Sequence, residues 1–223
     1  LNNKADLTAE NISFSSEGYP RFMLNIGSES LYPVELSIMG VHNVYNALAS
    51  IATGYVLGLP IDTIINSIND YKGTNRRLEL KGIINGIKII DDYAHHPTEI
   101  KASLKALRNS TKNKIWCIFQ PHTYSRTKLL LENFAQSFSE ADKVIIPDIY
   151  AAREQDNGLI HSTHLVDALL KNGIDAKYIS SFEDIENYII NNAEKGDVVV
   201  TMGAGNIYSI GDSLLEHNKK EAI

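Results

Sequence analysis

The sequence predicts an α/β fold, in which a mainly parallel sheet with helices on both faces follows a smaller segment of strands and helices. The main observation is that short apolar runs alternate with amphipathic stretches of helical period from Leu78 onward. Such alternation is typical of βα units in a parallel sheet. A second observation is that residues 1–70 follow a different pattern, which indicates a separate part of the chain.

The amino-terminal part is predicted to be a small antiparallel sheet followed by two helices. Residues 11–38 alternate in polarity between glycine-rich turn signals, which predicts two or three strands. In residues 41–59 the apolar side chains change to helical spacing. The predicted buried face of this helix consists of Val44, Ala47, Leu48, Ile51 and Val56. A second helix is expected from Ile61, and residues 70–77 break the periodicity, so we place a domain boundary there.

The carboxyl-terminal part is predicted to alternate strands and helices to its end. Strands are expected at 78–84, 87–93, 114–121, 143–150, 176–181 and 197–203. Helices are expected at 97–109, 128–140, 162–172, 182–193 and 206–217.

The composition indicates a globular protein and excludes several classes of partner. Hydrophobic residues make up 43% and charged residues 22%, with a formal net charge of −6. The absence of a Lys/Arg cluster argues against nucleic acid or an anionic membrane, and no apolar stretch approaches the ~20 residues of a membrane helix. The single cysteine, Cys117, lies in an apolar run and is expected to be an inert core residue in a reducing, cytoplasmic setting. Because the chain opens at Leu1 inside a polar run, we expect it to be a piece of a longer protein.

Polar or glycine-rich residues follow the predicted strands at one edge of the sheet. The segments are "DDYAHHP", "QPHTYSRT", "DIYAARE" and "MGAGN". Ligands bind past the carboxyl ends of strands in an open parallel sheet, so a site is expected at this edge. In "MGAGN", residues 202–206, the small residues are expected to let the backbone approach a ligand.

The stretch "DDYAHH", residues 91–96, places two carboxylates and two imidazoles within six positions, directly before a predicted helix. Pro97 suits the first helical position and Glu99 a capping position. Asp92, Tyr93 and His95 are therefore candidate functional residues. An alternative is that His96 caps the helix while Asp91 pairs locally.

Two further features of this edge bear on its chemistry. A zinc site made by His95, His96, His122 and Asp92 is a weaker alternative, because adjacent histidines on an extended segment point to opposite faces. Arg126 lies at the start of a predicted helix, where the positive end of the helix dipole disfavours a cation. A residue placed against its local preference often has a functional role, so we expect Arg126 to bind a ligand.

Six segments together resemble the Mur ligase family. They are "GVHNVYNALASIA" (40–52), "GTNRRLE" (73–79), "DDYAHHPTEI" (91–100), "FQPHTYSRT" (119–127), "DIYAARE" (148–154) and "MGAGNI" (202–207). The resemblance covers nearly the whole chain and implies the carboxyl-terminal half of a three-domain ligase. On that basis residues 1–72 end a central ATPase domain, 73–77 are a hinge linker, and 78–223 are a Rossmann-like amino-acid-binding domain.

The resemblance implies an ATP-dependent ligase that joins L-alanine to UDP-N-acetylmuramate through an acyl phosphate, for peptidoglycan precursors. Tyr93, His95 and Arg126 would hold the amino acid and the muramoyl end. ATP would be contacted by His42, Asn43 and Asn46 at the adenine, Arg77 at the phosphates and Asp92 at the ribose. No metal ligand is assigned to this chain, and the residues that bind Mg²⁺ are expected upstream, because no G-x-x-x-x-G-K-[ST] loop is present.

Two alternative functions remain open, and the chain differs from the family pattern at one position. A sister ligase that attaches a recycled murein tripeptide shares several of the motifs, although the loop "QPHTYSRT" favours the alanine enzyme. Without its phosphate loop the chain could instead be a non-catalytic nucleotide-binding module, and alone it is expected to be inactive. Some family members carry a second arginine where this chain has Thr123.

Overall fold

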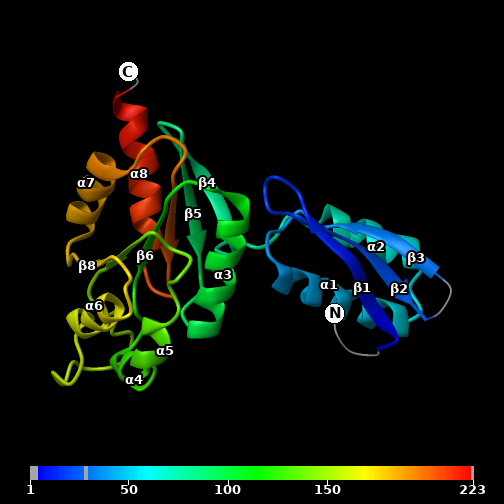
Figure 1. Cartoon of the computed structure of the whole chain (residues 1–223), viewed down its shortest axis with the longest axis horizontal. Coiled ribbons are helices and arrows are strands. Elements are labelled where there is room, and N and C mark those ends of the chain that lie inside the picture. The colour runs from blue at the N-terminus through cyan, green and yellow to red at the C-terminus, as the bar shows by residue number, and fades with distance from the viewer. Residues whose placement is uncertain (1–4, 28–29, 222–223) are drawn as a thin grey trace. The chain divides into compact units, whose positions relative to one another are not determined.

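The computed structural model describes residues 5–27 and 30–221. The chain divides into two compact units, residues 1–74 and residues 75–223. In Figure 1 the first unit runs from blue to cyan and the second from green to red.

The first unit is a three-stranded antiparallel sheet with two helices packed on it. The strands are β1 (Leu7–Phe14), β2 (Pro20–Ile26) and β3 (Ser30–Glu35), in the order β1-β2-β3. The helices are α1 (Val41–Val56), which contacts β1, and α2 (Ile61–Asp70), which contacts β3. This agrees with the strand and helix order predicted from the alternating and helical periods.

The buried stripe of α1 differs from the predicted one at its end. Val44, Ala47 and Ile51 are buried, and they pack in one core with Ile64 of α2. Val56 was predicted on this face but is 83% exposed. The stripe continues to Gly54 instead, three residues after Ile51, whereas Val56 lies five residues after it and so turns away from the core.

The second unit contains, within the described residues, a six-stranded sheet in the order β4-β5-β9-β6-β7-β8. Its strands are β4 (Glu79–Ile84), β5 (Ile87–Asp92), β6 (Ile115–Phe119), β7 (Lys143–Ile146), β8 (Ala176–Tyr178) and β9 (Val198–Met202). Its helices are α3 (Pro97–Ser110), α4 (Tyr124–Leu129), α5 (Leu131–Ala135), α6 (Ser162–Lys171), α7 (Phe182–Asn192) and α8 (Tyr208–Glu221). All strand pairs are parallel except β4 with β5. The predicted α/β fold with a mainly parallel sheet is confirmed.

Helices cover both faces of this sheet, because successive strand residues point to opposite sides. Trp116 and Ile118 of β6 belong to a core formed with α7 and α8. Phe119 points the other way and contacts the rings of Phe134 and Phe138, with centroids 5.5 and 5.3 Å apart. Figure 1 shows α3 across the sheet from α7 and α8.

Two local features differ from the sequence-based expectation. The helix predicted at 128–140 is divided into α4 and α5, which meet at Leu130, a residue with non-helical angles (φ −105°, ψ 16°). Strands β4 and β5 form a hairpin across Asn85 and Gly86, both with positive φ (51° and 80°). Asn-Gly is the preferred pair for such a turn, so this hairpin could have been predicted.

Cys117 is fully buried, and burial raises the pKa of its thiol, as expected for an inert core residue. In the part of the chain that the structure describes, no helix combines the length and apolar character needed to cross a membrane.

Candidate functional site

The carboxyl ends of β5, β6 and β9 lie level at one edge of the second unit's sheet. Asp92 of β5 and Phe119 of β6 are both paired with Met202 of β9. Backbone hydrogen bonds continue this register, from Gln120 N–H to the Met202 carbonyl and from Gly203 N–H to the Asp92 carbonyl, each 3.0 Å. The residues that follow the three strands therefore meet at this edge, as the sequence predicted.

A series of aromatic rings crosses this edge. The ring centroids of Tyr93 and His95 are 5.4 Å apart, and those of His95 and His122 are 6.2 Å apart. His122 in turn stacks on Tyr150 at 5.5 Å. Residues from the loops after β5, β6 and β7 thus form one surface.

The start of α3 fixes the position of the two adjacent histidines. The side chain of His96 accepts from the Thr98 N–H, and Glu99 accepts from the His96 and His95 N–H groups, at 3.3 and 3.0 Å. The alternative in which His96 caps the helix is therefore confirmed. Burial alone would raise the pKa of Glu99, but these hydrogen bonds and the His95 charge lower it below its ordinary value.

His95 is held in one tautomer by the backbone. Its Nδ1 lies 2.9 Å from the carbonyl oxygen of Tyr93. Because a carbonyl can only accept, Nδ1 carries the hydrogen, and the neutral ring keeps Nε2 as a hydrogen-bond acceptor. The side chain is 24% exposed, so this nitrogen belongs to a group that a ligand can reach.

The loop between β6 and α4 is strained and tied to its neighbours. Thr123 has a φ of 68°, which is rare for a β-branched residue. Its N–H donates to the Tyr150 carbonyl at 2.9 Å, and Glu154 accepts from the Ser125 N–H at 2.9 Å. Strained backbone that is anchored in this way is often found at functional sites.

Three buried polar atoms near this loop have no hydrogen-bond partner among the described residues. They are Oε1 of Gln120, Nδ1 of His122 and one terminal guanidinium nitrogen of Arg126. Burial, followed by the charges of Arg126 and His95, lowers the pKa of His122 below its ordinary value of 6.5. A guanidinium nitrogen and an imidazole nitrogen that are both left unsatisfied among the described residues suit a carboxylate or another polar anion.

The glycines of the 203–205 turn serve packing as well as backbone freedom. A Cβ on Gly205 would meet Oε1 of Gln120 at 2.4 Å and Cγ of Tyr150 at 2.8 Å. A Cβ on Gly203, whose φ is 148°, would meet the Gln120 carbonyl at 2.8 Å. Protein atoms therefore fill the space beside both glycines where a Cβ would lie, and the approach of this backbone to a ligand stays a prediction.

The two adjacent aspartates at the end of β5 both point into the protein. Asp92 is 2% exposed and accepts from the Leu78 N–H, the Ala94 N–H and the Ser103 hydroxyl, at 2.8, 2.8 and 3.1 Å. Burial raises the pKa of Asp92. A carboxylate so enclosed cannot present its oxygens to a ribose, so the geometry of this unit does not support that role.

Asp91 is also buried, at 1% exposed, and pairs with Arg76 at 2.8 Å. Asp91 is therefore paired within the protein, although its partner lies 15 positions away and not in the adjacent sequence. Arg76 was missed by the sequence reasoning, which selected the adjacent Arg77. Arg77 is exposed, and its Cζ lies 5.8 Å from the centre of the Tyr93 ring.

The remaining candidates, His42, Asn43 and Asn46, lie in the first turns of α1 in the first unit. The helix begins after Gly40, and Asn43 donates from its side chain to the Met39 carbonyl at 2.7 Å. Asn46 donates to Oδ1 of Asn43 at 2.9 Å. The nitrogen and the oxygen of the Asn43 amide are thus both hydrogen-bonded. Asn46 is exposed and lies four positions after His42, so the two side chains share one polar face of the helix.

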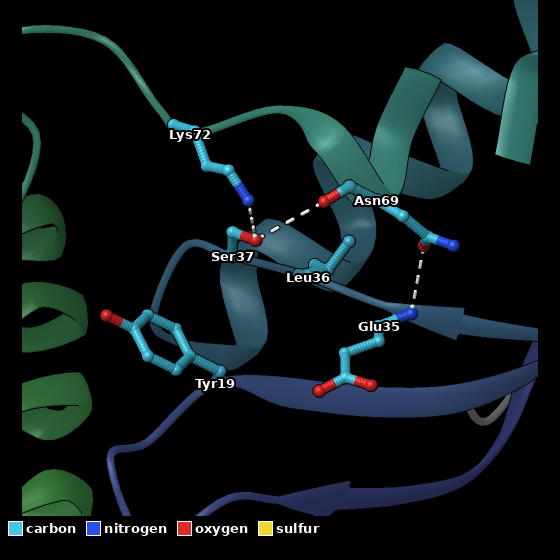
Figure 2. Close-up of a pocket in the computed structure, with 6 residues that line it drawn as sticks. All are labelled: Tyr19, Glu35, Leu36, Ser37, Asn69 and Lys72. Carbon is cyan, nitrogen blue, oxygen red and sulfur yellow. Dashed lines mark hydrogen bonds between the residues drawn. The ribbon is translucent and has the colours of Figure 1, made fainter. Parts of the chain in front are cut away.

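The first unit also has an open pocket of about 470 Å³ that the sequence did not indicate. Figure 2 shows Lys72 donating to the Ser37 hydroxyl, which donates to the Asn69 carbonyl, at 3.0 and 3.3 Å. The other lining residues are Tyr19, Glu35 and Leu36. The amide oxygen of Asn69 accepts from the Glu35 N–H, so these groups join the end of α2 to β3.

The zinc alternative is not supported by these positions. His96 is used as a helix cap and Asp92 is buried with three donors around it. Within residues 5–27 and 30–221, no three His, Cys, Asp or Glu side chains gather where a metal ion could be held.

Comparison with known proteins gives one consistent result. The family model described as "Mur ligase, glutamate ligase domain" matches residues 76–205. The curated UDP-N-acetylmuramate–L-alanine ligase of Caldanaerobacter subterraneus subsp. tengcongensis is 49% identical over 220 residues, which are 99% of this chain and 48% of that protein. The chain thus spans about half the length of the curated relatives it matches.

Solved structures agree with these sequence matches. The UDP-N-acetylmuramate–alanine ligase of Thermotoga maritima matches 98% of this chain and 47% of its own, with a TM-score of 0.83 and 27% identity. A murein peptide ligase from Psychrobacter arcticus matches 97% of this chain and 45% of its own, with a TM-score of 0.68 and 28% identity.

Proposed function

The chain belongs to the Mur ligase family, and from this we propose that it is the carboxyl-terminal half of an ATP-dependent ligase that joins L-alanine to UDP-N-acetylmuramate. The observation that carries the proposal is a buried guanidinium nitrogen of Arg126 that has no hydrogen-bond partner among the described residues. The Arg126 charge acts on His122, whose ring centroid lies 6.2 Å from that of His95. A cation in that position suits the carboxylate of an amino acid, which a guanidinium binds through two parallel hydrogen bonds.

The lactyl carboxylate must be activated before an amine can attack it, because a carboxylate is a poor electrophile. The lactyl carboxylate of UDP-N-acetylmuramate takes the γ-phosphoryl group of ATP, and ADP leaves. The amine of L-alanine then attacks the acyl carbon, an amide bond forms, and phosphate leaves with the bonding electrons. The amine must lose a proton in this step, and the Nε2 acceptor of His95 is suited to take it.

The polar face of α1 is proposed to border the adenine. Asn46 is exposed there, while Asn43 is engaged by Met39 and Asn46 and so orients its neighbour. Arg77, exposed beside the Tyr93 ring, is proposed to contact the phosphates. No Mg²⁺ ligand is proposed within the described part of this chain, where no cluster of metal ligands is found. Asp92 is left out of the proposed ligands because it is buried.

The substrate assignment favours L-alanine over a recycled tripeptide. The supporting observations are the 49% identity to an L-alanine ligase and the higher TM-score against the alanine enzyme than against the murein peptide ligase. In this proposal the enzyme works in the cytoplasm, where its nucleotide substrates are available, and serves peptidoglycan precursor synthesis.

The test is an ATP hydrolysis assay of the full-length enzyme with UDP-N-acetylmuramate and either L-alanine or the murein tripeptide. We expect turnover that depends on L-alanine, and none from residues 1–223 alone. Turnover with the tripeptide alone would contradict the assignment of L-alanine and would identify the chain as part of a murein tripeptide ligase. Absence of amine-dependent hydrolysis with both would favour a non-catalytic nucleotide-binding module.

A further inference from the structure

Arg76 makes an unusually large set of contacts for a partly exposed arginine. Its Nε donates to Oδ2 of Asp91 at 2.8 Å, and its terminal nitrogens donate to the carbonyls of Gly203 and Gly205, at 2.8 and 3.3 Å. Its Cζ also lies 4.9 Å from the ring centre of Tyr93 and 4.7 Å from that of Tyr208. One guanidinium thus joins the end of β5, the turn after β9 and the start of α8.

The backbone around Arg76 is strained and firmly anchored. Arg76 and Leu78 have φ values of 60° and 47°, in a region that residues other than glycine seldom adopt. The Arg76 carbonyl accepts from the Tyr93 N–H at 2.7 Å, and the Leu78 N–H donates to the buried carboxylate of Asp92 at 2.8 Å. Strain of this kind persists only where the surroundings impose it, and it fixes the intervening Arg77.

We propose that Arg76 is a positioning residue that sets the Tyr93 ring, the 203–205 turn and the direction of Arg77 for the ligase reaction. This inference rests on the proposed function, in which Arg77 contacts the ATP phosphates, and on our proposal that Tyr93, which the family resemblance places with His95 and Arg126 at the amino acid and the muramoyl end, contacts L-alanine. Arg76 itself need not touch substrate, because its donors are engaged within the protein.

A simpler role as the charge partner of Asp91 explains only one of these contacts. Asp91 also accepts from the Thr201 hydroxyl at 2.7 Å, so its other oxygen is already satisfied. Neutralising one carboxylate requires neither the two carbonyl contacts nor the rings of Tyr93 and Tyr208 on the guanidinium. The contacts with two carbonyls and two aromatic rings require the flat guanidinium group, with its several N–H donors, and not only a positive charge.

Two variants of the full-length enzyme separate the roles. Arg76→Lys keeps the charge beside Asp91 but cannot reach a carboxylate and two carbonyls together. Arg76→Met combined with Asp91→Asn removes both charges, so no unpaired carboxylate remains buried. Steady-state kinetics give the KM for L-alanine and for UDP-N-acetylmuramate, and thermal unfolding reports the fold.

We expect both variants to raise the KM for L-alanine about 10-fold or more, since small displacements of positioning groups have effects of this size. The KM for UDP-N-acetylmuramate should change by less than about 2-fold, a split that general destabilisation would not give. Kinetics near those of the wild type in either variant, or loss of the fold in both, would overturn the inference. A wild-type enzyme without L-alanine-dependent turnover would instead contradict the proposed function.

Discussion

The imidazole of His95 lies 6.2 Å from that of His122, centroid to centroid, although 27 positions separate the two residues in the sequence. The two rings differ in their electrostatic surroundings. His95 has Glu99 Oε2 at 3.5 Å, whereas His122 has the Arg126 charge and a buried Nδ1 without a partner among the described residues. The pair therefore combines a ring beside a carboxylate with a ring beside a cation.

The first prediction concerns the protonation of His122. Burial and then the Arg126 charge lower its pKa, so we expect its NMR titration midpoint below the ordinary value of 6.5. His122→Gln identifies the resonance, and Arg126→Gln should move the midpoint upward by removing the nearby charge. A midpoint at or above 6.5 in the unsubstituted chain would contradict this account.

The same shift has a consequence for stability. Between the lowered pKa of the folded state and 6.5, the unfolded chain binds a proton that the folded chain does not. The free energy of unfolding should therefore fall as the pH is lowered from 7 through this window. Urea unfolding at several pH values should show a smaller fall in His122→Gln than in the parent chain.

The next prediction tests the cation at Arg126. Arg126→Ala in the full-length enzyme should lower kcat/KM for L-alanine roughly 10²-fold, as for displaced positioning groups. Arg126→Lys should recover only part of this loss, because an ammonium cannot donate two parallel hydrogen bonds to a carboxylate. The matched control is Lys128→Ala, an exposed cation in the same helix α4. Equal losses from Arg126→Ala and Lys128→Ala would indicate a general charge effect.

The fold of the second unit was predictable because its signals are local. Each strand is an apolar run and each long helix has a continuous apolar stripe, as in α3 with Ile100, Leu104 and Leu107 buried. The break between α4 and α5 was missed because apolar residues continue through Leu130 with helical spacing. The loop before α4 is held by Tyr150 and Glu154, which lie more than 25 positions further along the chain, so no local sequence pattern reports these contacts.

For the candidate site, the sequence could predict which residues follow the ends of strands, but not which way each side chain points. Tyr93 and His95 follow β5 and Arg126 follows β6, two strands that flank β9 and run parallel to it, so the topology brings these residues to one edge of the sheet. Adjacent identical residues were not distinguishable, as Arg76 and Arg77 show. Arg76 points inward to the buried Asp91, whereas Arg77 is exposed. Which of the two arginines points inward depends on the positive φ angles of residues 76 and 78, which hydrophobic periodicity does not predict.

Another prediction concerns Asp197, a buried carboxylate remote from the site. It is 4% exposed and accepts from the Trp116 indole and the Glu194 N–H, at 2.9 and 3.1 Å. Asp197→Ala would leave these donors without partners, and we expect a loss of about 3 kcal/mol in the free energy of unfolding. The single tryptophan makes fluorescence in urea a probe of this unit. Asp167→Ala, at an exposed position in α6, should stay within about 0.5 kcal/mol of the parent.

The last prediction compares two glycines that differ in the space around them. A Cβ at Gly205 would lie 2.4 Å from Oε1 of Gln120 and 2.8 Å from Cγ of Tyr150, whereas at Gly211 in α8 the nearest atom would be Cγ2 of Ile89, at 3.1 Å. Gly205→Ala must displace a ring that stacks on His122, so we expect a loss of about 1–3 kcal/mol in the free energy of unfolding.

Gly211→Ala should change stability by less than about 1 kcal/mol, because the helical preference for alanine offsets a small adjustment of Ile89. Urea unfolding of both variants makes the comparison. Because Tyr150 supports His122, Gly205→Ala should also change the His122 NMR titration, and Gly211→Ala should not. An unchanged titration in Gly205→Ala would contradict this expectation, because it would mean that the 203–205 turn and the rings of Tyr150 and His122 are not coupled through packing.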